Sequence, residues 1–276
     1  LLFSAKAAAN HGQLDEARLI LTQFRDQHPD QADYANTLLA EWLIISAEID
    51  EAKSTLLALN NQSSRSLQLL SKVYSYQSDW SALYALLPQI KRQSGMDKDR
   101  LATLQIDCYC GLLSMPEKDL PASARANKVQ AVWSEIPRNL RQDSVLICGY
   151  VRALSAADEW EKALLTLSKA LKNQWQQELV EAYGELKFKD ATKQLAQGEN
   201  WLAMHPKDAD LLLALGRICR HMGFLGKAKD YLKSTIAISP SATAYAELAE
   251  VLALLGDSAS SSKIYRQGLL ASVPTK

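Results

Sequence analysis

The stretch DADLLLALGRICRHMGFLGKAKDYLKSTIAISP, residues 208–240, decides the fold of this chain. Pro206 and Pro240 bracket it, about 34 residues apart, which is a spacing typical of helical repeats. Within it, apolar residues recur every three or four positions, as they do on one face of a helix. Gly223 interrupts this pattern near the middle, where a turn is expected. The stretch therefore predicts two antiparallel helices joined by a short turn.

The positions of small and large residues sharpen this prediction. Two helices approach closely only where a small residue lies at their crossing, and Gly216 and Ala228 supply one in each half. Leu215 and Leu232 flank these positions, and Pro240 ends the second helix because it lacks an amide donor. The arrangement resembles the tetratricopeptide repeat. That resemblance implies an all-α fold, a right-handed superhelical solenoid of helix hairpins.

The same pattern recurs along the rest of the chain. A further unit follows directly, with Gly256 at its turn, and Gly12 lies at a similar turn near the start. Small residues of the second-helix type recur at Ala17, Ala52 and Ala163. No segment alternates with the period of two that is typical of a strand. We therefore expect about sixteen helices, over residues 1–10, 13–27, 31–46, 49–59, 63–76, 79–94, 97–113, 122–135, 140–156, 159–172, 175–186, 190–204, 208–222, 225–238, 241–255 and 257–272.

One region breaks the rhythm of the repeats. The segment SMPEKDLPAS, residues 114–123, contains two prolines and is too polar to be helical. The unit around it, 97–135, is longer than one repeat. We predict N-terminal helical repeats over 1–113, a loop or subdomain seam over 114–121 and C-terminal tetratricopeptide repeats over 122–276, packed as one continuous solenoid.

The residue inventory argues against catalysis and against nucleic acid as a partner. The 31 basic and 31 acidic residues give a formal net charge of zero, so no basic surplus is available for phosphates. The sequence contains no glycine-rich phosphate loop and no nucleophile motif. Cys108 and Cys110 would point about 200° apart on a helix and cannot share a metal ion. No histidine has the spacing of a zinc site. We predict no enzyme, no catalytic residue and no metal site.

The repeat itself predicts where a partner binds. In tetratricopeptide hairpins, the second, fifth, ninth, twelfth and thirteenth residues of the first helix line a concave groove. We count these positions from Ser144, Trp175 and Ala209. The groove then carries a largely basic set of side chains: Arg152, Tyr183, Lys187, Arg217, Arg220 and His221.

A basic groove would favour carboxylates, because arginine meets them through two parallel hydrogen bonds. An acidic segment of a partner protein is the expected ligand, and porphyrin propionates are the rival. The alternative is that these charges are solvated or paired within the chain.

Several short sequence motifs in the second half of the chain point to one family. They are W-S-E-I-P (133–137), E-A-Y-G (181–184), N-W-L-A-M-H-P (200–206), L-L-L-A-L-G-R-I-C (211–219) and L-G-K-A (225–228). Together they resemble the C-terminal region of the HemY proteins of proteobacteria, which are inner-membrane proteins with tetratricopeptide repeats linked to heme biosynthesis. The resemblance covers roughly residues 130–272 and agrees in character over the earlier helices.

This resemblance implies a non-catalytic scaffold, tethered to the bacterial inner membrane by two N-terminal transmembrane helices. Its partners would be enzymes of late heme and porphyrin biosynthesis. The chain starts inside the expected helix 1–10 without an initiator Met, so we expect a fragment of a longer protein. A chain that starts in the cytoplasm and crosses the membrane twice returns to the cytoplasm. We therefore expect this domain in the cytoplasm, with the periplasm as the alternative.

Two other functions remain open. The chain could be a heme or porphyrin carrier, with Cys148, Cys219 and His221 as the conceivable axial ligands. It could also be a generic repeat adaptor unrelated to heme. For the leading function, the protein–protein interaction scaffold, no cofactor is expected.

Overall fold

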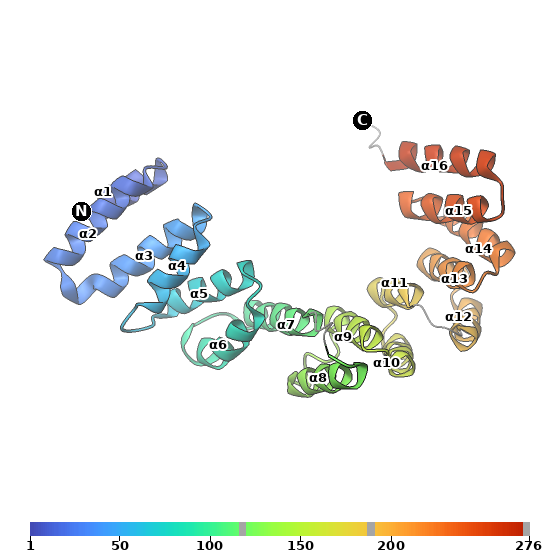
Figure 1. Ribbon diagram of the computed structural model, residues 1–276, viewed down its shortest axis with the longest axis horizontal. Coiled ribbons are helices and arrows are strands. Elements are labelled where there is room, and N and C mark those ends of the chain that lie inside the picture. Colours follow the sequence, from blue (N-terminus) through green and yellow to red (C-terminus); the bar gives the residue numbers. More distant parts are fainter. Residues whose placement is uncertain (116–119, 187–190, 273–276) are drawn as a thin grey trace. The chain divides into compact units, whose positions relative to one another are not determined.

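The computed structural model describes residues 1–115, 120–186 and 191–272, and their regular structure is helical throughout (Figure 1). These residues form sixteen α-helices and one short 3-10 helix, with no strand among them. Every expected helix is present and differs only at its ends. The prediction of an all-α helical repeat is therefore confirmed.

The chain divides into two compact units, Leu1–Met115 and Pro116–Lys276. Handedness, the assignment of the seam and continuous stacking across this boundary stay predictions. The first unit contains α1 (Leu2–Asn10), α2 (Leu14–Gln27), α3 (Ala32–Ile45), α4 (Ile49–Leu57), α5 (Ser64–Tyr76), α6 (Trp80–Gln93) and α7 (Lys98–Ser114). Each of these helices packs against the next one along the chain.

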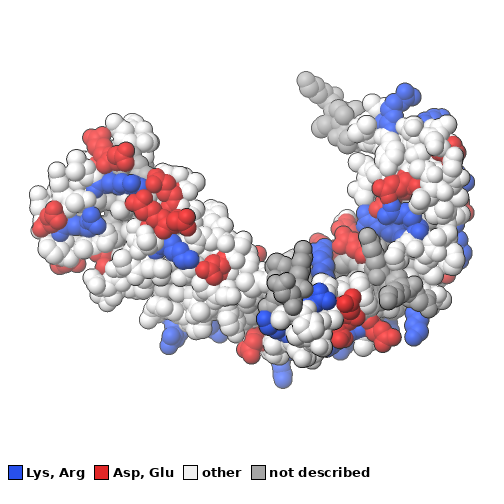
Figure 2. Space-filling model, viewed as in Figure 1, with Lys and Arg blue, Asp and Glu red and all other residues white. Residues whose placement is uncertain are grey.

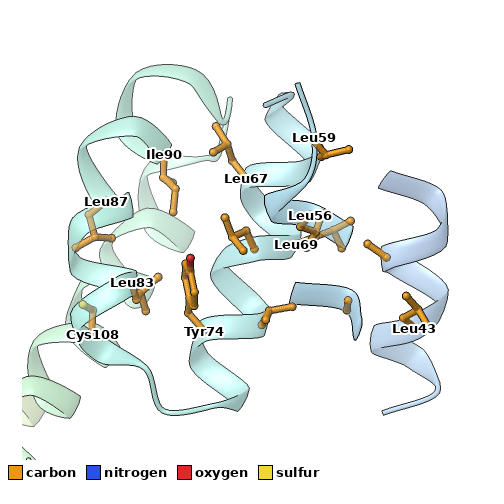
Figure 3. Packing of buried hydrophobic residues seen from close by; sticks show 14 residues of the cluster. Leu43, Leu56, Leu59, Leu67, Leu69, Tyr74, Leu83, Leu87, Ile90 and Cys108 are labelled. Carbon is orange, nitrogen blue, oxygen red and sulfur yellow. The ribbon is translucent and has the colours of Figure 1, made fainter. Parts of the chain in front are cut away.

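Leucine side chains fill the core of the first unit. Leu43, Leu56, Leu67 and Leu83 come from α3, α4, α5 and α6, and all four are fully buried. Figure 3 shows them turned toward the space between the helices, and Cys108 of α7 completes the cluster. A periodic apolar face thus holds each hairpin to its neighbour, as in other repeat proteins.

The second unit contains α8 (Ala122–Glu135), α9 (Ser144–Ala156), α10 (Trp160–Asn173), α11 (Gln177–Glu185), α12 (Thr192–Met204), α13 (Ala209–His221), α14 (Leu225–Ile238), α15 (Ala242–Leu254) and α16 (Ser258–Ser272). The first helices of successive hairpins, α9, α11, α13 and α15, contact one another in that order. Figure 1 shows them along the inner side of this unit, while α10, α12 and α14 lie along its outer side.

Small residues lie at the helix crossings, as predicted. Ala163 and Ala228 have no exposed surface. A Cβ atom added to Gly184 would lie 2.6 Å from the Cα atom of Ala214, and one added to Gly216 would lie 2.7 Å from Leu232. Such distances leave no room for a side chain, so the small residues set how closely the helices approach.

One turn geometry recurs in six hairpins. The amide of Gly223 donates to the carbonyl of Arg220 at 3.1 Å, and the amide of Phe224 donates to that of Cys219 at 2.8 Å. This pair of bonds closes a helix through one residue in the left-handed region. That residue is Gly12, Ala47, Ser78, Asp158, Gly223 or Gly256. The turns predicted at the three glycines are confirmed.

Helix α8 differs from the other described helices of its unit because none of its residues is buried. It therefore contributes a partly covered surface to the fold. Within the described ranges, no helix combines the length and the hydropathy that crossing a bilayer requires.

Candidate functional site

The start of each first helix fixes which side chains reach the inner face of the second unit. Asp143 caps α9, Asp208 caps α13 and Ser241 caps α15, each accepting a hydrogen bond from an amide in the first turn. Such caps hold a helix start at one residue. The ninth residues of α9, α11, α13 and α15 are then charged and alternate in sign: Arg152, Glu185, Arg217 and Glu250.

These four residues belong to a set that links neighbouring hairpins. We name this set the charge ladder and define it by six residues: Arg152, Glu185, Arg217, Arg220, Glu247 and Glu250. Figure 2 shows basic and acidic side chains adjoining each other over α13 and α15, on the inner side of the second unit.

One end of the charge ladder is shielded. Arg217 Nε donates to Glu247 Oε1 at 2.8 Å, and Arg220 Nη2 lies 3.1 Å from Glu247 Oε2. Arg220 also pairs with Glu250. The side chains of Arg217, Arg220 and Glu247 are only 20%, 28% and 14% exposed. The charges of both arginines are therefore met within the chain, which is one of the two alternatives that the sequence left open.

The other end of the charge ladder is open. Arg152 Nη2 lies 3.3 Å from Glu185 Oε2, and these side chains are 65% and 50% exposed. An exposed pair of this kind contributes little to stability, because water and salt screen it. It can exchange its partners for those of another protein at small cost.

Acidic side chains of α11 and α13 lie between the open and the shielded end of the charge ladder. Gln177 Nε2 donates to Glu181 Oε1 at 3.1 Å and lies 3.5 Å from Asp210 Oδ1. Partial burial raises the pKa of Asp210, and the nearby carboxylates of Asp208 and Glu181 raise it further. The inner face therefore carries charges of both signs and is not uniformly basic.

The predicted role of Tyr183 in the groove is wrong. Its side chain has no exposed surface, its hydroxyl donates to the carbonyl of Gln194, and Gln194 Nε2 donates to the Tyr183 carbonyl at 2.6 Å. Helix α11 begins at Gln177 and not at Trp175, so its ninth residue is Glu185. Tyr183 belongs to the core, where it cannot meet a ligand.

The contacts of Trp175 explain why α11 begins two residues later than the groove positions assumed. Its indole Nε1 donates to Asp208 Oδ2 at 2.7 Å, and its ring stacks on His205 with centroids 4.0 Å apart. The residue therefore anchors the loop before α11 to the next hairpin. Lys187, also predicted in the groove, lies outside the described residues. His221 is the last residue of α13 and is exposed.

Sequence reasoning missed the acidic half of the charge ladder. Glu185 stands 33 residues after Arg152, and Glu247 stands 30 residues after Arg217. The first offset is close to one repeat period, and the second is about one helical turn shorter. Side chains one repeat apart lie on adjacent helices of a stacked array, so the period itself was the available signal.

The three conceivable heme ligands are not brought together as a site. Cys148 and Cys219 are buried, and burial raises the pKa of each thiol to about 11. A thiolate is the form that ligates a metal ion, and these thiols stay protonated at neutral pH. Cys219 and His221 are two residues apart on α13, so they point away from each other. The described residues hold no cluster of three or more His, Cys, Asp or Glu arranged for a metal ion.

No family model and no curated protein matches this chain. Solved structures with a similar arrangement of helices include a tetratricopeptide repeat protein from Parabacteroides merdae. It has a TM-score of 0.42 and 10% identity, over 99% of this chain and 93% of that one.

Two further structures are the APC/C hetero-tetramer Cut9-Hcn1 and Naa15/Naa10 bound to HypK-THB. For the first, the TM-score is 0.40 at 14% identity, covering 96% of this chain and 58% of that one. For the second, it is 0.39 at 12% identity, covering 94% and 46%.

Proposed function

We propose that this chain is a non-catalytic scaffold that binds other proteins through the charge ladder of its second unit. The observation that carries the proposal is the open pair Arg152–Glu185, which lies on the same helix set as the shielded cluster. Charged groups that are exposed yet held in register give a partner both steering and specificity. Arginine is also enriched at protein interfaces.

The spacing of the charge ladder indicates the kind of segment that fits it. Packed helices lie about 8–10 Å apart, which sets the distance between successive steps of the charge ladder. A segment in the polyproline II conformation has three residues per turn and advances about 3.1 Å per residue, so a partner with charges at every third residue would meet one step after another. The alternation of sign in the charge ladder calls for alternating charges in that segment.

The finer proposal is a scaffold for enzymes of late heme and porphyrin biosynthesis, tethered to the inner membrane and facing the cytoplasm. Its support is the resemblance of residues 200–206 and 211–219 to the HemY proteins. A heme carrier is the weaker alternative, because Cys148 and Cys219 are buried and protonated.

A charge swap tests the role of the open pair. The double variant Arg152→Glu with Glu185→Arg keeps an ion pair and the net charge but reverses both signs toward a partner. Crosslinking and pull-down of the full-length protein from native membranes should show capture by wild type and strong loss of capture by the swap. The melting temperature should not change, because the pair is exposed.

A second swap serves as the control. Lys227 and Glu199 form an exposed pair at 3.2 Å on α14 and α12, outside the charge ladder. The variant Lys227→Glu with Glu199→Lys should capture partners as wild type does. Undiminished capture by the Arg152 and Glu185 swap would remove the charge ladder from consideration. Capture of proteins outside the heme pathway would point to the generic adaptor.

A further inference from the structure

A pocket of about 660 Å³ lies between α8, α9 and α10, and no residue of the charge ladder lines it. Its apolar wall is built around Trp133 of α8, which stacks on Tyr150 of α9 with ring centroids 4.0 Å apart and an interplanar angle of 11°. Ile147 and Leu165 extend this wall. The pocket exists because α8 buries none of its residues and leaves a gap beside α9 and α10.

The polar lining of the pocket has one sign of charge. Arg141 and Lys169 contribute cations, and no carboxylate lines the pocket. Arg141 uses Nε and Nη2 to donate to the carbonyls of Ile136 and Ser134, both at 2.8 Å, which leaves other donors of its five N–H groups. Lys169 is exposed and forms no ion pair with any residue the structure describes. In a chain with zero net charge, this lining is complementary to an anion.

Tyr150 adds a hydroxyl donor to the lining of the pocket. The residue as a whole is only 4% exposed, but its hydroxyl is not among the described polar atoms that are buried without a partner, so the hydroxyl itself is accessible. Burial raises the pKa of Tyr150, so the phenol remains a donor at neutral pH. This hydroxyl, on a residue that lines the pocket, is suited to an acceptor supplied by a ligand.

We propose that this pocket binds a short segment of a partner protein in which a large apolar side chain stands next to a carboxylate. The apolar side chain would pack on the Trp133–Tyr150 wall, and the carboxylate would meet Lys169 and Arg141. The proposal rests on the proposed function, in that the chain binds proteins, but it assigns a second and separate site.

The rim of the pocket favours a peptide segment over a small molecule. Leu165 lies at this rim and is 70% exposed, so a ligand here stays open to solvent on one side. Small-molecule sites bury most of the ligand surface. The side chains of Gln142, Asn173 and Gln174 also line the pocket, and their amide groups match the N–H and C=O groups of a peptide backbone.

Peptide titration tests this proposal. The probe is the peptide Ser-Leu-Phe-Asp-Ser, with fluorescein on its N-terminal amine and an amidated C-terminus. A second peptide carries Asn in place of Asp, and a third carries Ala in place of Phe. Fluorescence anisotropy with the whole chain should show saturable binding of the first peptide. Both altered peptides should bind about tenfold more weakly, since each loses one of the two recognised groups.

Three protein variants locate the binding. Lys169→Glu should weaken binding about tenfold, whereas Lys233→Glu makes the same charge change on the exposed surface of α14 and should leave it unchanged. Tyr150→Phe removes only the hydroxyl and should weaken binding about fivefold. All three should keep the helical circular dichroism of wild type.

The outcomes separate this proposal from the proposed function. Any of three results would overturn the proposed peptide site. They are an absence of saturable binding, equal affinity for the Asp and Asn peptides, and equal effects of Lys169→Glu and Lys233→Glu on affinity. None of these results depends on the charge ladder. If the pocket fails while the native protein still captures partners, and loses them on the Arg152 and Glu185 swap, only the pocket is wrong.

Discussion

Two parts of the second unit, α11–α14 and α8–α10, are built from the same kind of helix but pack differently. In the first part, Gly184 and Gly216 leave no room for a side chain, and the helices close on each other. In the second part, α8 buries no residue, and a ring stack between Trp133 and Tyr150 stands where close contact would be. The second part also has a small residue at a crossing, Ala163 of α10, which has no exposed surface. The packing of the neighbouring helix, and not the presence of small residues alone, therefore decides whether a hairpin buries its face or leaves a pocket.

Removing a tryptophan from each part should give the largest contrast. Trp201 is 5% exposed and packs against Tyr183, with ring centroids 5.0 Å apart. Trp201→Ala should lower the free energy of unfolding by about 4 kcal/mol, because it leaves a cavity. Trp133→Ala should cost about 2 kcal/mol, since its ring is only half-buried beside an existing pocket. Urea unfolding of both variants measures the difference. Equal losses would mean that α8 is packed as tightly as α12.

Adding volume should sharpen the same comparison. Ala228 has no exposed surface, so Ala228→Leu overpacks the crossing of α14 with α13 and should cost about 2–3 kcal/mol. Ala131 of α8 is exposed, and Ala131→Leu should change stability by less than about 0.5 kcal/mol. Melting followed by circular dichroism compares them. A wild-type melting temperature for Ala228→Leu would contradict the crossing geometry.

The helices could be predicted from the sequence because a small residue, a large residue and a turn recur at one period. The expected starts of α13 and α15, at residues 208 and 241, differ from the observed ones by one residue, and Asp208 and Ser241 cap these helices. The expected start of α9 is residue 140, but this helix begins at Ser144, after its cap Asp143. Helix α11 starts after Gln176, whose side chain makes no capping bond. Nothing local marked that start, so the count began too early and assigned Tyr183 to the groove.

The pairing within the candidate site could not be obtained from single positions. In the sequence, Arg217 and Arg220 have no evident partner. In the structure, Glu247 of the next hairpin pairs with both of them. The pocket was equally hidden, because it follows from a contact that α8 fails to make. Tertiary neighbours, and not residue types, decide both features.

The two ends of the charge ladder should also respond differently to the loss of a carboxylate. Glu247→Gln leaves Arg217 and Arg220 poorly solvated and should cost about 1–2 kcal/mol. Glu185→Gln should cost less than about 0.5 kcal/mol, because its pair with Arg152 is exposed. Urea unfolding at low and high salt measures both, and only the small Glu185 effect should vanish as salt rises. A salt-insensitive loss in Glu185→Gln would show that the open end is also structural.

The smallest contrast lies in the turns that end α9 and α13. Both turns hold a left-handed residue, Asp158 with φ 63° in the first and Gly223 with φ 77° in the second. A side chain at such a position costs about 1 kcal/mol, so Gly223→Ala should lower the free energy of unfolding by about that amount. Asp158→Gly should raise it by only about 0.5 kcal/mol, since aspartate tolerates this region better than most residues.

Asp158 Oδ2 also lies 3.5 Å from Nη2 of Arg125 in α8, and the Asp158 side chain is 64% exposed. Asp158→Asn removes the charge but keeps the tolerance for the left-handed region. If Asp158→Asn is neutral in urea unfolding and Asp158→Gly is stabilising, the backbone governs this turn. If both variants are destabilising, the link to Arg125 holds α8 in place, and the loosely packed part depends on that ion pair instead of on buried surface.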